Sequence, residues 1–340
     1  MAQTSSDARA GETGEADAHG VPVVDVSSFA TQESLPVKPE DLSEDQRATV
    51  QAWGDALTRT GFAVVVEHGI ADDDLRAAFD ASKRFFLELP SEEKLKYNYG
   101  PYGTPQGGYT PQGIEGVGRS LDAADAPADL VESYVFNAAA RANPDNHEPV
   151  LFKNAVGYST KATWLMHVLH CISAFALDLP GNFFDEFHTN PDSVMRCACY
   201  PPLDKSKVEG GSIRYSAHTD YQGFTILALE ASLDGGPTGP TGLQVNRDGE
   251  WKDVVLPTSG NPLVTNIGDL WQVWTAGRWK STLHRVMNPP ADSEAAKRYR
   301  FSLPYFTGPN AEANIVPIDG SGEAVNAGEY LRQKLDITNV

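Results

Sequence analysis

Three side chains that can bind a metal stand out in the second half of the chain. His218 and Asp220 lie two positions apart in AHTDYQGFTIL, beside an apolar run typical of a strand, and His284 follows 66 residues later in WKSTLHRV. Alternate residues of a strand share a face. Two imidazoles and one carboxylate on one face of a metal leave adjacent coordination positions open, which suits a non-haem Fe(II) that must hold a chelating ligand together with dioxygen. Zinc and manganese fit the same ligands, so this triad alone predicts a metal centre without identifying the metal.

A second group of residues is suited to hold an anion. Arg300 and Ser302 alternate in RYRFSLPYF, while Arg196, Ala198 and Tyr200 share one strand face in VMRCACYPP. A guanidinium is costly to bury unless an anion meets it, and a planar fork beside a hydroxyl suits a carboxylate. A bound dicarboxylate would then chelate the metal at one end and contact Arg300, Ser302 and Tyr200 at the other. The alternative is that Arg300 is an ordinary strand arginine paired with an external acid.

Helical signals dominate the first half of the chain. The segment 43–61 has apolar residues at helical spacing, with a capping box from Ser43 and Gln46 at its start and Gly61 at its end. A further helix is predicted over about 158–178.

Two features of this half do not follow the helical pattern. His167 and His170 fall off the apolar stripe of the helix at 158–178, so we expect both on the surface. The glycine-rich segment 98–118 has little periodicity and predicts a long flexible loop, of the kind that often serves as a functional lid.

The pattern changes at about residue 193. Eight short strand-like runs follow one another, separated by turns rich in Gly, Pro, Asp and Asn, and this spacing predicts a sandwich or barrel. We therefore predict a mainly β fold: a double-stranded β-helix (jelly-roll) core with flanking N-terminal and C-terminal α-helices. The expected organisation is a disordered polar tail at 1–20 and a single domain at 21–340, made of an N-terminal helical and strand region at 21–190, the jelly-roll core at 191–310 and a C-terminal segment at 311–340.

Composition narrows the classes of partner. The chain has 27 basic and 46 acidic residues, a formal charge of −19, which argues against a nucleic-acid partner. The apolar runs are far too short for a membrane span, and the first twenty residues lack the pattern of a signal peptide. Three irregularly spaced cysteines (Cys171, Cys197 and Cys199) fit a reducing compartment, so we expect a cytoplasmic protein. The sequence predicts no particular oligomeric state.

The chain resembles the isopenicillin N synthase-like family of Fe(II)/2-oxoglutarate-dependent dioxygenases over most of residues 21–310. The similarity is strongest in HTDYQGFTIL, GLQVNRDGEW, NIGDLWQVWTAGRWKSTLHRV and RFSLPYF. The resemblance implies that Fe(II), 2-oxoglutarate and O2 take part in the reaction. It also implies roles for six residues: His218, Asp220 and His284 as iron ligands, and Arg300, Ser302 and Tyr200 as the clamp on the oxoglutarate carboxylate. One departure is Ala198, where many plant members carry an asparagine.

The implied reaction is oxidation of a small molecule in specialised metabolism, with succinate and CO2 as coproducts. Hydroxylation is the expected outcome, with desaturation or ring formation as variants. One alternative is an oxidase or cyclase of the same fold that uses no 2-oxoglutarate and whose Arg-x-Ser motif holds the carboxylate of the substrate. The remote alternative is a binding protein without catalytic activity.

Substrate selection is expected from the glycine-rich loop, from nearby arginines and from an aromatic wall, where a cationic side chain would favour an acidic substrate. The alternative for each arginine or tyrosine is a solvated or packing side chain. The candidate residues are Tyr102, Tyr109, Arg119, Arg196, Arg214 and Phe306.

Overall fold

The computed structural model describes residues 20–100, 107–121, 126–204, 206, 208, 211–235, 241–258 and 260–338. All but the last residue of the predicted tail therefore lies outside the described residues, as does Tyr102.

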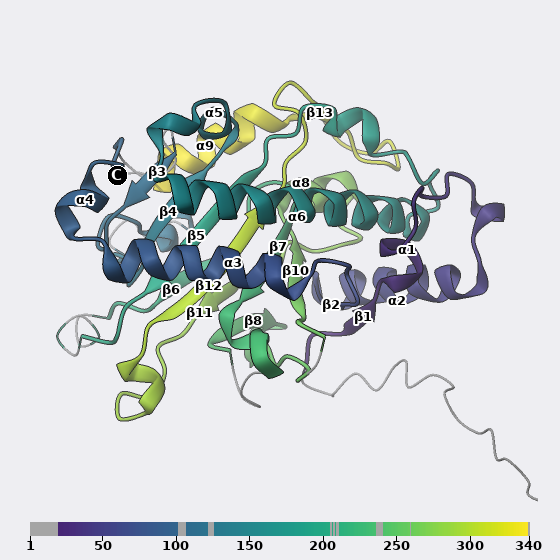
Figure 1. Ribbon diagram of the computed structural model, residues 1–340. Coiled ribbons are helices and arrows are strands. Elements are labelled where there is room, and N and C mark those ends of the chain that lie inside the picture. The colour runs from purple at the N-terminus through teal and green to yellow at the C-terminus, as the bar shows by residue number, and fades with distance from the viewer. Residues whose placement is uncertain are drawn as a thin grey trace, which may run out of the picture.

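A large mixed sheet forms the centre of the molecule (Figure 1). Its spatial order is β1-β2-β10-β7-β12-β5-β4-β3, and its neighbours pair antiparallel except for β1 and β2, which are parallel. The strands are β1 (Val23–Asp25), β2 (Phe62–Val66), β3 (Gly108–Thr110), β4 (Glu132–Phe136), β5 (Val194–Tyr200), β7 (Phe224–Leu229), β10 (Leu263–Ile267) and β12 (Arg300–Phe306).

A smaller sheet packs against one face of the large one. Its order is β6-β11-β8-β9, from β6 (Tyr215–His218), β8 (Leu243–Arg247), β9 (Glu250–Asp253) and β11 (His284–Val286). Apolar side chains of both sheets form one buried cluster, in which Ala198 and Tyr200 of the large sheet join Val245 and Val286 of the small one. We call the space between the sheets the interior. A separate short pair, β13 (Asn314–Ile315) and β14 (Val325–Asn326), lies near the C-terminus.

Helices cover the opposite face of the large sheet, which we call the helix side. Figure 1 shows α3 and α6 running side by side across it. The α-helices are α1 (Ser27–Ala30), α2 (Glu44–Thr60), α3 (Asp72–Lys83), α4 (Ser91–Leu95), α5 (Ala138–Ala142), α6 (Pro149–Ala176), α8 (Asp269–Trp274) and α9 (Ala327–Thr338). Short helices of other types are η1 (Pro39–Asp41), the π-type η2 (Arg84–Glu88), η3 (Val117–Leu121), η4 (Pro144–Asn146), η5 (Asp185–His188), η6 (Glu230–Gly235) and η7 (Glu294–Lys297). None of the helices in the described part of the chain is long and apolar enough to cross a bilayer.

Local sequence signals explain where several elements begin and end. The predicted helix at 43–61 is confirmed as α2: Ser43 and Gln46 form the capping box, and Gly61 ends the helix with a φ of 67°. A side chain at Gly61 would also meet the carbonyl of Lys280, so glycine is required there on two grounds. The mainly β core with attached helices agrees with the sequence prediction.

Two sequence expectations for the N-terminal half are wrong. His170 is not on the surface: it is 2% exposed and its ring packs against Phe184, Phe224 and Trp271. The reason is that α6 is enclosed by α2, α3 and the large sheet, so a wider arc of the helix is buried than one apolar stripe. The segment predicted as a flexible loop, 98–118, also has some regular structure, because it contains β3 and the first two residues of η3.

Candidate active site

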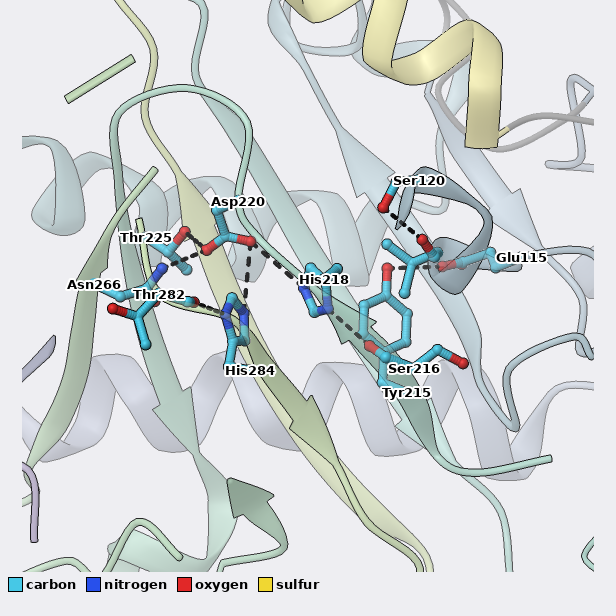
Figure 2. A network of polar contacts seen from close by, with 11 residues as sticks. Glu115, Ser120, Tyr215, Ser216, His218, Asp220, Thr225, Asn266, Thr282 and His284 are labelled. Atoms are coloured by element: carbon cyan, nitrogen blue, oxygen red, sulfur yellow. Dashed lines mark hydrogen bonds and ion pairs between the residues drawn. The ribbon is translucent and has the colours of Figure 1, made fainter. Parts of the chain in front are cut away.

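The three side chains predicted as metal ligands converge on one point (Figure 2). His218 ends β6 and His284 begins β11, and the two residues face each other across the antiparallel pair. Asp220 Oδ1 lies 3.6 Å from Nε2 of His218 and 3.7 Å from Nε2 of His284. The three potential ligand atoms all lie within 4.8 Å of one another, and all three residues are buried.

Backbone carbonyls fix the orientation of both imidazoles. Nδ1 of His218 lies 2.8 Å from the carbonyl of Ser216, and Nδ1 of His284 lies 3.0 Å from the carbonyl of Thr282. A carbonyl only accepts hydrogen bonds, so each Nδ1 carries a proton, and in the neutral form of each ring Nε2 keeps its lone pair. Both lone pairs belong to the nitrogens that face Asp220, as expected of rings prepared to bind a metal.

Two polar side chains orient the carboxylate of Asp220. Its Oδ2 accepts hydrogen bonds from Thr225 Oγ1 and, at 2.6 Å, from Asn266 Nδ2, which leaves Oδ1 toward the histidines (Figure 2). Burial raises the pKa of Asp220, but the two histidines and the Thr225 hydroxyl lower it more, so the net pKa lies below its usual range. Burial, helped by the nearby His218, lowers the pKa of His284 to about 4. A carboxylate beside a neutral imidazole is a donor set for a divalent cation.

A cavity of about 270 Å³ adjoins the triad. His218 and Asp220 form part of its wall, and Phe306 lines it from the end of β12. The C-terminal helix α9 also contributes to the wall, through Leu331 and Leu335. Asp129 holds one side in place, because its carboxylate accepts hydrogen bonds from the backbone N–H of Val117 in η3 and of Ser216 in β6.

The predicted anion clamp is assembled at the other end of β12. Arg300 pairs with Tyr200 across β12 and β5, and its guanidinium carbon lies 4.8 Å above the Tyr200 ring. Ser302 is 2% exposed and pairs with Ala198 on the same strands. Nε of Arg300 donates to the carbonyl of Thr241 at 3.3 Å, while its buried Nη1 has no hydrogen-bond partner among the described residues.

Arg214, predicted to contact the substrate, lies near this clamp instead of lining the cavity. It is 5% exposed, and its Nη2 makes only long contacts, of 3.4 Å to the carbonyl of Ala295 and 3.5 Å to that of Arg298. Burial lowers the pKa of Arg214 to about 10, and the charge of Arg300 contributes. Neither guanidinium has a carboxylate within ion-pair distance in the described part of the chain. Burying a guanidinium without a counter-ion is costly, and a bound anion would compensate both charges.

The remaining predicted substrate residues have different surroundings. Phe306 lines the cavity. Arg196 does not line it, and its Nη2 instead binds Oε2 of the wall residue Glu115 at 2.6 Å. Tyr109 faces the helix side, where its hydroxyl donates to Glu132 at 2.6 Å. Arg119, on η3, is half-buried and also does not line the cavity.

Several residues at the site were not predicted from the sequence. Thr225 and Asn266 bind Asp220, and each is a polar residue within a largely apolar buried strand, a signal that could have found them. Glu115 and Asp192 line the cavity from segments without regular periodicity, and no comparable signal marks them.

Two family models match the chain. One is described as the N-terminal region of the non-haem dioxygenase in morphine synthesis and matches residues 21–156. The other describes the 2OG-Fe(II) oxygenase superfamily and matches residues 191–309, the range that contains all the triad and clamp residues.

Curated relatives and solved structures agree with these matches. The chain is 30% identical to a homoarginine-6-hydroxylase of Oryza sativa subsp. japonica, over 95% of this chain and 98% of the relative. It is 27% identical to the proline hydroxylase buaE of Petromyces alliaceus, over 84% and 89%. The crystal structure of a full-length Neurospora crassa protein in complex with alpha-KG matches with a TM-score of 0.75 and 27% identity, over 95% of this chain and 98% of that one. Another structure of the same Neurospora crassa protein contains both alpha-KG and thymine and matches with a TM-score of 0.72 and 26% identity, over 96% and 99%.

Proposed function

The chain belongs to the isopenicillin N synthase-like family of 2-oxoglutarate/Fe(II)-dependent oxygenases, and from that premise we propose that His218, Asp220 and His284 are its iron ligands. The enzyme uses Fe(II), 2-oxoglutarate and O2 to oxidise a small molecule, with succinate and CO2 as coproducts. The observation that supports the ligand assignment is the convergence of two Nε2 atoms and one carboxylate oxygen at a buried cavity.

The donor set fits a ferrous ion because two neutral nitrogens and one carboxylate leave positions for a chelating keto acid and a gas. When bound, the ion supplies dioxygen activation coupled to decarboxylation of the keto acid. The residues of the chain hold and orient the three proposed metal ligands. The carbonyls of Ser216 and Thr282 orient the imidazoles with Nε2 toward the site, and Asn266 keeps Oδ1 of Asp220 directed at it.

We propose that Arg300, Ser302 and Tyr200 bind the remote carboxylate of 2-oxoglutarate and that Arg214 adds a second positive charge. The orphaned Nη1 of Arg300 and Nε of Arg214 are donors that a carboxylate would satisfy. β12 carries this clamp at its first residues and the cavity wall at Phe306, its last. The cosubstrate therefore belongs at the clamp, deep in the interior, and the substrate in the cavity that Phe306 lines.

We also propose a jelly-roll core, a single domain and a cytoplasmic location. The two sheets share one apolar interior, which supports a jelly-roll (double-stranded β-helix) core. The family matches at 21–156 and 191–309 support a single domain over 21–340. All three cysteines are buried and unpaired, which supports a reducing, cytoplasmic location.

The relatives bear on the substrate and the outcome. Two are named for hydroxylation of homoarginine and proline, and the Neurospora crassa protein was crystallised with thymine. We propose hydroxylation of a small nitrogen-containing molecule as the principal reaction. The alternative is a cyclising oxidase in which Arg300 holds the carboxylate of the substrate.

An anaerobic titration tests the assignment. Fe(II) and 2-oxoglutarate together should give a visible charge-transfer band that neither gives alone, and exposure to air with a substrate should release succinate. A band that is absent, or that survives in His284→Ala, would contradict the ligand set. Oxidation of a substrate without succinate would favour the cyclising oxidase.

A further inference from the structure

The charge of the cavity wall indicates what kind of molecule enters it. Apart from Asp220, the carboxylate residues that line the cavity in the described part of the chain are Glu115 and Asp192. Within the described residues, no lysine or arginine lines it. These two carboxylates differ in how the protein compensates them.

Glu115 is neutralised by the protein itself. Its Oε2 lies 2.6 Å from Nη2 of Arg196, and both side chains are 2% exposed. Its Oε1 accepts a hydrogen bond from Ser133, and the hydroxyl of Tyr215 donates to Oε2 at 3.5 Å. Both oxygens are therefore occupied, and a ligand would have to displace existing bonds to use this carboxylate.

Asp192 has no such compensation. It lies two residues before β5, half-buried, beside the loop that follows β12, where its backbone N–H donates to the carbonyl of Pro309. No described residue forms a hydrogen bond or an ion pair with its carboxylate. Arg141 is close enough to affect the pKa of Asp192, but its guanidinium donates to the carbonyls of Ser193 at 3.0 Å and Phe136 at 3.5 Å.

The surroundings make this carboxylate costly to leave unpaired. Burial raises the pKa of Asp192, and Arg141 offsets only part of that rise. Much of the remaining wall is apolar and includes Val135, Phe306 and Leu331. A partly desolvated carboxylate in an apolar wall gains most from a cationic partner.

We infer that Asp192 binds a positively charged group of the substrate, a protonated amine or a guanidinium, so that the enzyme oxidises a small basic compound. This inference rests on the proposed function, because it takes the cavity beside the triad as the substrate site. It reverses the acidic substrate expected from the arginines in the sequence, since Arg196 is neutralised by Glu115 and Arg214 lies at the clamp.

Isosteric ligands that differ in charge provide the test. Zn(II)-substituted protein saturated with 2-oxoglutarate is titrated in a calorimeter with L-homoarginine and L-arginine, and with their neutral ureido analogues L-homocitrulline and L-citrulline. We expect the guanidinium compounds to bind about 30-fold more tightly, as for a charge pair shielded from water. Succinate release by the Fe(II) enzyme with the same compounds and with L-lysine should follow the same order.

Two variants assign the preference to a residue. Asp192→Asn should remove the difference between charged and neutral ligands while the affinity for 2-oxoglutarate stays the same, which also shows that the variant is folded. Glu186→Gln removes a carboxylate from an exposed side chain six residues away. It should change neither the preference for charged ligands nor the affinity for 2-oxoglutarate.

Three results would overturn the inference: equal or tighter binding of the neutral analogues, a preference that persists in Asp192→Asn, or no response to any cationic compound. Loss of 2-oxoglutarate binding in the parent protein would instead contradict the proposed function, so the two failures are distinguishable.

Discussion

The two faces of the large sheet each carry a buried group of basic and tyrosine side chains, and the two groups differ in one respect. On the helix side, Nζ of Lys94 lies 3.1 Å from Glu132 Oε2 and 3.1 Å from the carbonyl of Phe86. The hydroxyl of Tyr109 donates to the same carboxylate at 2.6 Å. The charge of Lys94 therefore has its counter-ion within the protein.

In the interior, Arg300 and Arg214 lie near Tyr200, and neither has a carboxylate partner in the described residues. Arg196, also in the interior, follows the helix-side pattern because Glu115 neutralises it. A buried charge that the protein satisfies is part of the structure, whereas one left with unpaired donors is available to a ligand. Whether a buried basic residue has a counter-ion in the protein, more than how deeply it is buried, distinguishes a structural role from a ligand-binding role.

The largest effect should come from the triad, the proposed metal site. Asp220→Ala removes the one anionic ligand, and we expect turnover to fall at least about 1000-fold because several kcal/mol of stabilisation are lost. Iron content and succinate release measure this effect. The metal-free variant should melt no lower than the metal-free parent, and full iron content in the variant would contradict the assigned ligand.

A substitution in the helix-side group of Lys94, Glu132 and Tyr109 should lower the free energy of unfolding. Glu132→Gln leaves the buried ammonium of Lys94 without its counter-ion, and we expect a loss of about 3–5 kcal/mol in the free energy of unfolding. Urea denaturation of the metal-free protein measures it. Glu93→Gln, which breaks an exposed pair with Lys96, is the control and should have no measurable effect. Weakened 2-oxoglutarate binding in a folded Glu132→Gln protein would break the distinction between the faces.

The interior clamp should respond in the opposite way. Arg300→Met removes an uncompensated buried charge, so the stability of the metal-free protein should be unchanged or higher. Its affinity for 2-oxoglutarate should fall about 30-fold or more, because the carboxylate loses its forked partner. Calorimetry on the Zn(II) protein measures the affinity. Arg300→Lys should be intermediate, since it keeps the charge without the fork, and unchanged affinity in Arg300→Met would refute the clamp.

The smallest effect should come from the residues that orient Asp220. Thr225→Val keeps the shape of the side chain but removes one donor to Oδ2, while Asn266 keeps the other. We expect metal affinity to fall about 10-fold, measured by competition with a chelator. The affinity of the metal-saturated variant for 2-oxoglutarate should match that of the parent, and an equal loss of both affinities would indicate a general disturbance of the interior.

The sequence predicted the side chains that follow strand alternation. Arg300 and Ser302 are two positions apart within β12, so one rule of backbone geometry places both on one face. Asp220 lies two residues beyond the end of β6, and its carboxylate is oriented by Thr225 and Asn266 instead of by strand alternation. The position of His284 opposite His218 follows from the pairing of β11 with β6.

The sequence could not distinguish Arg196 from Arg300. Both arginines face the interior from neighbouring strands, and their roles differ because Glu115, 81 residues away from Arg196, reaches one of them and not the other. That contact arises only from tertiary folding. For the same reason the sequence could not predict that Asp192, and Leu331 and Leu335 of α9, line the cavity. These residues come from parts of the chain that no periodic pattern marks.

Both histidines proposed as iron ligands are aligned by a main-chain oxygen two residues earlier in the sequence. Any amino acid at position 216 or 282 presents that oxygen, so the geometry of the imidazoles survives substitution there. The side chains of Ser216 and Thr282 therefore make other contacts. The Ser216 hydroxyl donates to Asp129, and the Thr282 hydroxyl, just before β11, donates to the carbonyl of Thr60 at the end of α2. Natural variation at these two sites should therefore alter the rigidity of the scaffold before it alters the chemistry.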